Sequence, residues 1–304
     1  MPIVVFGSLN MDLVAQVTRL PQAGETLLGS DFAMVPGGKG ANQAVAAARL
    51  GVPTTMVGRV GEDSFGTQLC ASLQTAGVAT DLILREPGPS GVALIAVDEA
   101  GENQITVIPG ANGRVDVTDV QRLPLAADPS ILLMQFEIPL AAVLAAARGA
   151  GNHRVIVDPA PARAELPEDL YGLVDILTPN QTEASELTGI DVYDVATATA
   201  AAQVLYQRGT PTVIVKLGSQ GAVAVSGAEI FHIPAFQVAA VDSVAAGDAF
   251  NGGLAVALWE GKPLRAAVIW ASAVAALSVI TAGAQPSLPT RQQVDAFLRK
   301  QSLR

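Results

Sequence analysis

The chain has 304 residues, half of them hydrophobic and 15% charged, so it can bury a large core and is not intrinsically disordered. Its formal net charge of -10 argues against nucleic acid as a partner, because an acidic protein repels the phosphate backbone. The single cysteine, Cys70, cannot form an intrachain disulfide, and this usage is typical of a reducing compartment such as the cytoplasm. The N-terminal residues lack the basic and long apolar regions of a signal peptide, so we expect no targeting segment.

Strand-like and helix-like patterns alternate along most of the chain. Strands are predicted at 3–6, 54–59, 131–135, 154–158, 175–178 and 212–216. Helices are predicted at 40–50, 64–76, 140–148 and 196–208, from 181, and from near 247, 264 and 290. The alternation predicts an α/β fold in which helices cover both faces of a mostly parallel sheet.

The uncharged stretch 266–284 is long enough to raise the question of a membrane span. It consists mostly of Ala, Ser and Gly rather than Leu and Ile. We therefore predict a buried core helix that ends near Thr281, and no membrane partner.

Two stretches, 11–35 and 91–108, break the alternation. Their apolar and polar residues alternate around glycine-containing turns, which is typical of β-hairpins. We predict that they form a small antiparallel β-lid, inserted in one domain that spans 1–304. Because open sheet edges are usually covered, we also expect two lids to pair in a homodimer and to bury apolar positions such as Val14, Leu27, Val92 and Leu94.

Residues 245–248 read Ala-Ala-Gly-Asp and lead into a predicted helix. The backbone N–H groups at a helix start are unpaired and form an anion site. Asp248 could accept a proton from a hydroxyl while these groups hold a phosphoryl group, or it could only cap the helix. Because a helix N-terminus lowers the pKa of an aspartate, Asp248 is expected to be ionised at neutral pH and to be a weak base.

Two earlier segments have the composition of a ligand site. Three glycines surround Lys39 within 35–42, and glycine lets a backbone approach a ligand closely, although an ordinary glycine-rich connection is the alternative. Asn10 and Asp12 share one face of extended chain after the first strand. This pair suits contact with sugar hydroxyls, or else forms an Asx turn.

Two later segments each follow a predicted strand. Asn180 and Glu183 have the spacing of a capping box, or of a site with Asn180 near nucleotide phosphates and Glu183 near a hydrated Mg²⁺. The turn at 216–221 could line an adenine or phosphate site, or be only a turn.

None of these segments indicates a function alone, but their order along the chain does. Asn10 with Asp12, the run Gly37-Gly38-Lys39-Gly40-Ala41-Asn42, Asn180 with Glu183, and Gly247-Asp248 resemble the ribokinase family of carbohydrate kinases, the PfkB type, over nearly the whole chain. The family-like run at Gly37 continues through Gln43-Ala44-Val45-Ala46, and further family-like runs are Pro159-Ala160-Pro161-Ala162 and Gly283-Ala284-Gln285-Pro286-Ser287. The resemblance implies a ribokinase-like three-layer sandwich and an ATP-dependent kinase that phosphorylates a sugar, expected at O5 of D-ribose.

The resemblance also implies a role for each site residue. Asp248 would be the base, beside an anion hole formed by Ala245, Ala246 and Gly247. The sugar would contact Asn10, Asp12, Gly38, Lys39, Gly40, Asn42, Glu137 and Asp248. ATP would contact Asn180, Lys216, Gly218, Ser219, Gly221, Gly247 and Ser272, and Glu183 would help to organise Mg²⁺. A monovalent cation, expected to be K⁺, would lie beside the anion hole against Asp242, Val244, Ser278, Thr281, Gly283 and Ser287.

Two positions depart from the family pattern. Ala245 stands where many members have glycine, which costs backbone freedom but keeps the N–H donors. Met11 lies between the two sugar contacts and is bulkier than alanine, so it bears on the choice between ribose and 2-deoxyribose.

Other functions remain open at this point. The nearest alternatives are kinases of the same family that act on 2-deoxyribose, fructose or a nucleoside. A nucleoside kinase is expected to need an apolar or aromatic slot for the base, and aromatic residues make up only 4% of this chain. A non-catalytic sugar or nucleotide sensor is the alternative from another class, although such a protein should have lost Asp248.

Overall fold

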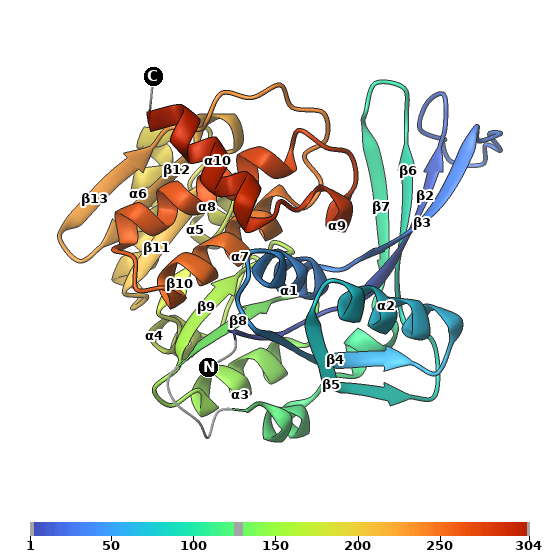
Figure 1. The fold of residues 1–304 in the computed structure, drawn as a ribbon, viewed down its shortest axis with the longest axis horizontal. Coiled ribbons are helices and arrows are strands. Elements are labelled where there is room, and N and C mark those ends of the chain that lie inside the picture. Colours follow the sequence, from blue (N-terminus) through green and yellow to red (C-terminus); the bar gives the residue numbers. More distant parts are fainter. Residues whose placement is uncertain (1–2, 125–129, 303–304) are drawn as a thin grey trace.

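The computed structural model describes residues 3–124 and 130–302, and its larger sheet has nine strands (Figure 1). Their order across the sheet is β13 (Glu229–Ile233), β12 (Ala222–Ser226), β11 (Thr212–Lys216), β10 (Ile176–Leu177), β9 (Arg154–Asp158), β8 (Ile131–Gln135), β1 (Ile3–Phe6), β4 (Thr54–Gly61) and β5 (Val78–Glu86). All neighbours from β11 to β5 are parallel, and β12 and β13 are antiparallel at one edge. The predicted mostly parallel sheet is therefore confirmed, while β5, β12 and β13 are additions that the sequence patterns did not predict.

Helices cover both faces of this sheet, as the alternation predicts. One face carries α1 (Lys39–Arg49), α2 (Ser64–Thr75), α7 (Ala246–Trp259), α8 (Leu264–Ser278) and α10 (Arg291–Ser302). The other carries α3 (Leu140–Gly149), α4 (Glu168–Leu173), α5 (Gln181–Thr188) and α6 (Val195–Gln207). Short helical turns are η1 (Gly110–Arg114), η2 (Val117–Arg122), η3 (Gly218–Gln220) and α9 (Ala284–Ser287).

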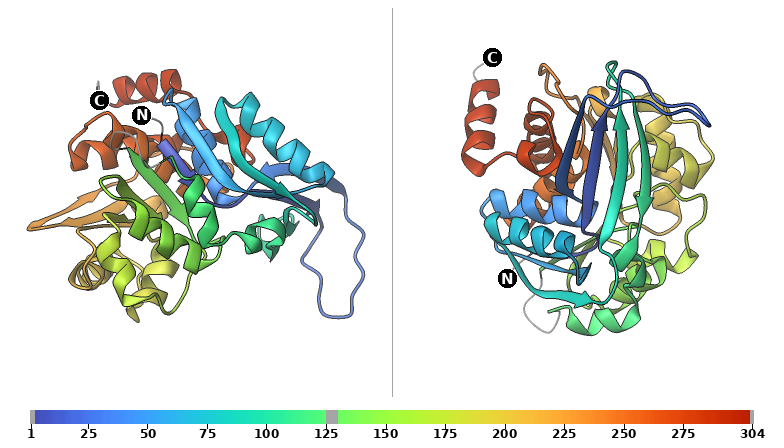
Figure 2. Two further views of the ribbon diagram at one scale, coloured as in Figure 1. Left: turned by 90° about the horizontal axis from the view of Figure 1, so that it is seen from below. Right: turned by 90° about the vertical axis from the view of Figure 1, so that its right-hand side faces the viewer.

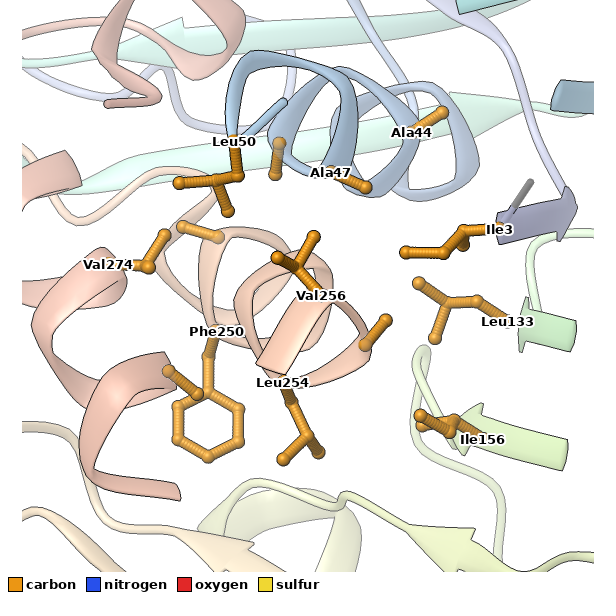
Figure 3. Close-up of a cluster of buried hydrophobic side chains, with 14 of the residues drawn as sticks. Ile3, Ala44, Ala47, Leu50, Leu133, Ile156, Phe250, Leu254, Val256 and Val274 are labelled. Atoms are coloured by element: carbon orange, nitrogen blue, oxygen red, sulfur yellow. The ribbon is translucent and has the colours of Figure 1, made fainter. Parts of the chain in front are cut away.

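Each parallel strand contributes side chains to two separate cores. In β1, Ile3 and Val5 enter one core while Val4 and Phe6 enter the other, because successive side chains of a strand point to opposite faces. Figure 3 shows the first core, in which Ile3, Leu133 and Ile156 from the strands face Val256 and Leu254 of α7. Burial on both faces explains why these strands are continuous apolar runs in the sequence.

The core helix predicted to end near Thr281 ends slightly earlier than expected. α8 stops at Ser278, three residues before Thr281, and Val279 is its C-cap. The residues that follow form an irregular loop that leads into α9. None of the helices described is long and apolar enough to cross a membrane.

The smaller sheet contains both predicted hairpins and stands apart from the larger one, as Figure 2 shows. Its order is β3 (Asp31–Gly37), β2 (Asn10–Gln16), β6 (Gly91–Val97) and β7 (Asn103–Ile108). Each hairpin is antiparallel, and β2 and β6 pair in parallel to join them. The side chain of Met11 is wholly buried in the core with α1 and α7, so any effect of its bulk on the choice of sugar would be indirect.

The strand order reverses next to β1, which has β4 on one side and β8 on the other. Ligands of open α/β sheets bind at such a switch point, beyond the carboxyl ends of the strands. Ser8 after β1, Glu137 after β8 and Asp158 at the end of β9 all lie at this edge. The smaller sheet extends from the same edge, since β2 follows β1 after three residues.

Candidate active site

Asp248 is held by side chains from α1 and does not cap its own helix. The N-cap of α7 is Ala245, with no side-chain capping bond, and Asp248 is the third residue of the helix. Its Oδ2 accepts from Asn42 Nδ2 and its Oδ1 from Gln43 Nε2, both at 3.0 Å. The interpretation of Asp248 as a mere cap is therefore wrong.

The electrostatics of Asp248 differ from the expectation for a helix N-terminus. Burial raises its pKa to about 6, and the positive charge of Lys39 and the two amide donors offset only part of that rise. The predicted lowering of the pKa is therefore wrong, because loss of hydration outweighs the helix dipole. The carboxylate is still mostly ionised at neutral pH, and it is a stronger base than an ordinary aspartate.

The loop before α7 presents backbone donors. Ala245 adopts a left-handed conformation, with φ of 61°, in the position where many family members have glycine. Ala246 N donates to the Ser243 carbonyl at 3.2 Å, whereas the described residues offer no acceptor to the N–H groups of Ala245 and Gly247. Two of the three expected anion-hole donors are thus open. A Cβ at Gly247 would lie 3.4 Å from Lys216 Nζ, so a cation stands beside them.

Glu137 joins several of the predicted sugar contacts. Its Oε2 accepts from Ser8 Oγ at 2.6 Å, from Lys39 N at 3.0 Å and from Asn10 Nδ2 at 3.4 Å. The ends of β1 and β8 and the start of α1 therefore meet at one carboxylate. Burial disfavours the charged form of Lys39 and lowers its pKa. The surrounding carboxylates, Asp248 foremost, outweigh this effect and hold the pKa above its usual value.

The glycines of the run before α1 allow close backbone packing. A Cβ at Gly38 would lie 2.7 Å from Asn10 N, and one at Gly40 would lie 2.5 Å from Ser8 N. Asp12 lies over Gly37, where a Cβ would approach Oδ2 to 2.2 Å. The structure thereby brings together all of the predicted sugar contacts. They include Asn42, which donates to Asp248.

Asp12 makes a testable contribution to pH dependence. Burial, followed by the charges of Glu137 and Asp248, raises its pKa to about 7. If the ionised form binds sugar hydroxyls, the KM for the sugar should rise about tenfold between pH 8 and pH 6, as the ionised fraction falls. Steady-state kinetics across this range measure the effect. Asp12→Asn should bind sugar weakly with no such dependence, and a KM of the wild type that is constant with pH would refute the assignment.

The nucleotide-side residues also cluster. Asn180 and Glu183 form the predicted capping box. Glu183 N donates to Asn180 Oδ1, and Asn180 N donates to Glu183 Oε2, both at 2.8 Å. Glu183 is buried, and burial followed by the charge of Asp158 raises its pKa. Lys216 Nζ pairs with Asp158 Oδ1 at 2.9 Å. Capping does not exclude a ligand role for Glu183, since its carboxylate lies within the same electrostatic cluster.

The remaining nucleotide candidates are more exposed. Gly218 and Ser219 lie in the solvent-exposed turn η3, and Gly221 ends it with φ of 96°. Ser272 is half-buried on α8. These residues offer an open surface rather than a closed pocket.

The predicted cation site consists of two loops tied by one aspartate. Asp242 Oδ1 accepts from Val244 N at 2.9 Å and Oδ2 from Gly283 N at 2.8 Å. Ser278 and Ser287 are buried and direct their hydroxyls to carbonyls of their own helices, whereas Thr281 is exposed. Within 3–124 and 130–302, no group of three or more His, Cys, Asp or Glu side chains is arranged so that it could hold a metal ion.

Five polar residues of the cluster were not predicted. Asn112 holds Asn10, with Nδ2 donating to Asn10 Oδ1 at 2.7 Å. Gln135 donates to Gln43 at 2.7 Å, and the others are Ser8, Gln43 and Asp158. Asp158 could have been found, because it is an acidic residue at the carboxyl end of a predicted strand. The remaining four carry no spacing signal.

Comparison with known proteins agrees with this geometry. The model of the pfkB family of carbohydrate kinases matches residues 2–291. A ribokinase of Haemophilus influenzae is 40% identical over 97% of this chain and 98% of its own, and a deoxyribokinase of Salmonella typhi is 36% identical over 98% and 99%. The structure of Arabidopsis thaliana ribokinase complexed with ribose and ATP superposes with a TM-score of 0.89 at 33% identity, covering 98% of each chain. The chain therefore belongs to the pfkB family of carbohydrate kinases.

Proposed function

We propose that this protein is a ribokinase, which transfers the γ-phosphate of ATP to O5 of D-ribose to give D-ribose 5-phosphate. The observation that carries the proposal is the place of Asp248. Its carboxylate adjoins the open N–H groups at the start of α7 and the Asn10, Asp12 and Glu137 cluster. A proton acceptor, an anion site and a set of hydroxyl-binding groups thus converge at one edge of the sheet.

The chain's own residues account for the main steps of such a transfer. Asn10, Asp12, Lys39, Asn42 and Glu137, with the backbone of Gly38 and Gly40, would hold the sugar hydroxyls. Asp248 would orient the acceptor hydroxyl and accept its proton, while Ala245 and Gly247 N–H groups stabilise the transferring phosphoryl oxygens. The transition state is loose, so positioning and charge neutralisation dominate the rate.

ATP would lie over the neighbouring strands. Asn180, Lys216 and the turn residues Gly218, Ser219 and Gly221 would contact it, with Ser272 at the border of the site. Mg²⁺ bound to the phosphates would neutralise their charge, and Glu183 would help to order its water ligands. The smaller sheet would act as a lid that excludes water, which otherwise competes for the phosphoryl group.

A panel of acceptors tests the proposal. ADP release would be followed in a coupled assay with D-ribose, 2-deoxy-D-ribose, D-fructose and adenosine. The highest kcat/KM is expected for D-ribose. A higher value for 2-deoxy-D-ribose would favour the deoxyribokinase alternative, and ADP release with none of the acceptors would favour a sensor.

K⁺ is expected to raise the activity. The proposed cation lies beside the anion hole, where it would order the loop from Asp242 to Val244 without contacting substrate. Replacing choline chloride by KCl at constant ionic strength should increase kcat about fivefold or more, with Na⁺ less effective. Asp242→Ala, which releases Val244 N and Gly283 N, should reduce this activation. Equal rates in KCl and choline chloride would refute the cation site.

The lid is also proposed as the interface of a homodimer in the cytoplasm. Val14, Ile95 and Ile105 lie in register on the face that carries Asp12, and Ile105 is 53% exposed on the edge strand β7. Two lids packed together would cover this apolar face and the open edge. Leu94 points to the other face of the lid and is also exposed. It would be buried, as expected, only if this second face were covered too.

Sedimentation at micromolar concentration is expected to show a dimer. Ile105→Lys should shift it to monomer and raise the KM for the sugar, because the cover over the sugar loses its support. Gln104→Lys adds the same charge on the opposite face and serves as the control. A fully active wild-type monomer would contradict the dimer proposal.

A further inference from the structure

Gln43 lies on α1 with a side chain that is wholly buried, and every polar atom of its amide is used. Its Oε1 accepts from Gln135 Nε2 at 2.7 Å. Its Nε2 donates both to Asp248 Oδ1 and to Asp158 Oδ2, each at 3.0 Å. One amide group thus joins two carboxylates that come from α7 and β9.

The second oxygen of each carboxylate is held as well. Asp248 Oδ2 accepts from Asn42 Nδ2 at 3.0 Å, and Asp158 Oδ1 accepts from Lys216 Nζ at 2.9 Å. A continuous path therefore runs from the candidate base through Gln43 to a lysine next to the anion hole. Lys39 from α1, Asp158 from β9 and Asp12 from β2 are the charged groups that act on Asp248.

Two buried carboxylates repel each other unless donors lie between them. A glutamine offers two N–H donors on one nitrogen, which is the number that this junction needs. Asparagine is one methylene shorter, and methionine has a similar length without any donor. The junction therefore depends on the chemistry of the side chain at position 43 and not only on its volume.

We propose that Gln43 is a positioning residue that fixes the carboxylate of Asp248 for proton acceptance and ties it to Asp158 and Lys216 on the nucleotide side. The inference rests on the proposed kinase function. A carboxylate that is held in one orientation is already placed for the acceptor hydroxyl, so less conformational entropy is lost in the reaction. Hydrogen bonds to the ionised form also favour that form, so Gln43 keeps the base ionised against the effect of burial.

Gln43→Met tests the role with little change in side-chain length. We expect kcat to fall about 10–100-fold, since small misplacements of reacting groups have effects of this size. The KM values for sugar and ATP should change less than about threefold. The acid limb of the kcat–pH profile should move up by about one pH unit, because Asp248 loses a donor to its charged form.

Thr210→Val is the matched control for a purely structural effect. Thr210 is wholly buried before β11, at the sheet edge opposite the site, and its hydroxyl donates to the Tyr171 carbonyl at 3.0 Å. This variant should lower the Tm and leave kcat and the pH profile unchanged. The proposal is overturned if Gln43→Met behaves like Thr210→Val.

Gln135→Met extends the test in case Gln43→Met does not fold. It removes the donor to Gln43 Oε1 and leaves the Gln43 amide in place, so a smaller upward shift of the acid limb is expected. An unshifted limb in Gln135→Met would overturn the proposal. The two levels of inference stay distinguishable: a wild type that phosphorylates no sugar refutes the kinase function, whereas an active wild type with unshifted variants refutes only the role of Gln43.

Discussion

Asp248→Asn should lower kcat by about 10²–10⁴-fold while ATP still binds, because an amide cannot accept the proton that the carboxylate takes from the sugar hydroxyl. Asp248 is buried, Asn42 and Gln43 donate to its two oxygens, and asparagine has nearly the same size and shape. Steady-state kinetics with D-ribose measure the loss, and calorimetric titration with ATP measures the binding.

Asp248→Ala separates two causes of this loss. In Asp248→Asn the new amide nitrogen meets another donor in either orientation, that of Asn42 or that of Gln43, whereas alanine introduces no donor. Both variants should therefore lose activity to a similar extent if proton acceptance is what matters. An Asp248→Asn enzyme with the kcat of the wild type would show that Asp248 is not the base.

Gly38→Ala is expected to lower kcat/KM for the sugar about 10²-fold. Gly38 has φ of 87°, and a Cβ there would lie 2.7 Å from Asn10 N and 3.1 Å from Leu9 Cα. Both neighbours are backbone, so β2 must move and carry the sugar-binding side chain of Asn10 with it. Displacements of about 1 Å have effects of this size on catalysis.

Gly51→Ala is the control that isolates backbone strain. Gly51 follows the other end of α1 with the same φ of 87°, yet a Cβ there would meet nothing within 4 Å. Each alanine should cost about 1–2 kcal/mol for its left-handed conformation, measurable by denaturant unfolding. Only Gly38→Ala should lose activity, and equal kcat/KM values for the two variants would contradict the argument.

The sequence predicts the architecture well because its signals are local. The inner strands β1 and β8 to β11 are buried on both faces and are therefore short apolar runs, and several of the helices between them have Ala-rich patterns. β12 and β13 escaped prediction, although they form an antiparallel hairpin at the sheet edge. The end of α8 at Ser278 was missed because the apolar composition continues past it.

The contacts of the site are harder to predict from the sequence, because they join residues that lie far apart along the chain. Gln43 is bonded to Asp158 and Asp248, which are 115 and 205 residues away, and no spacing rule connects them. The pKa of Asp248 was misjudged for the same reason, since burial depends on α1 and its neighbours rather than on the local helix start. Met11 lies between Asn10 and Asp12 in the sequence, and because side chains alternate along a strand it points into the core.

Ala245 holds a left-handed loop conformation without being glycine. Its φ of 61° is maintained although alanine disfavours it, while Ala246 N bonds Ser243 O and Ala249 N bonds Ala245 O on either side. The surrounding chain thus imposes a conformation that glycine would adopt freely. A motif defined by glycine at this position would overlook the present chain, whereas one defined by the direction of its N–H groups would include it.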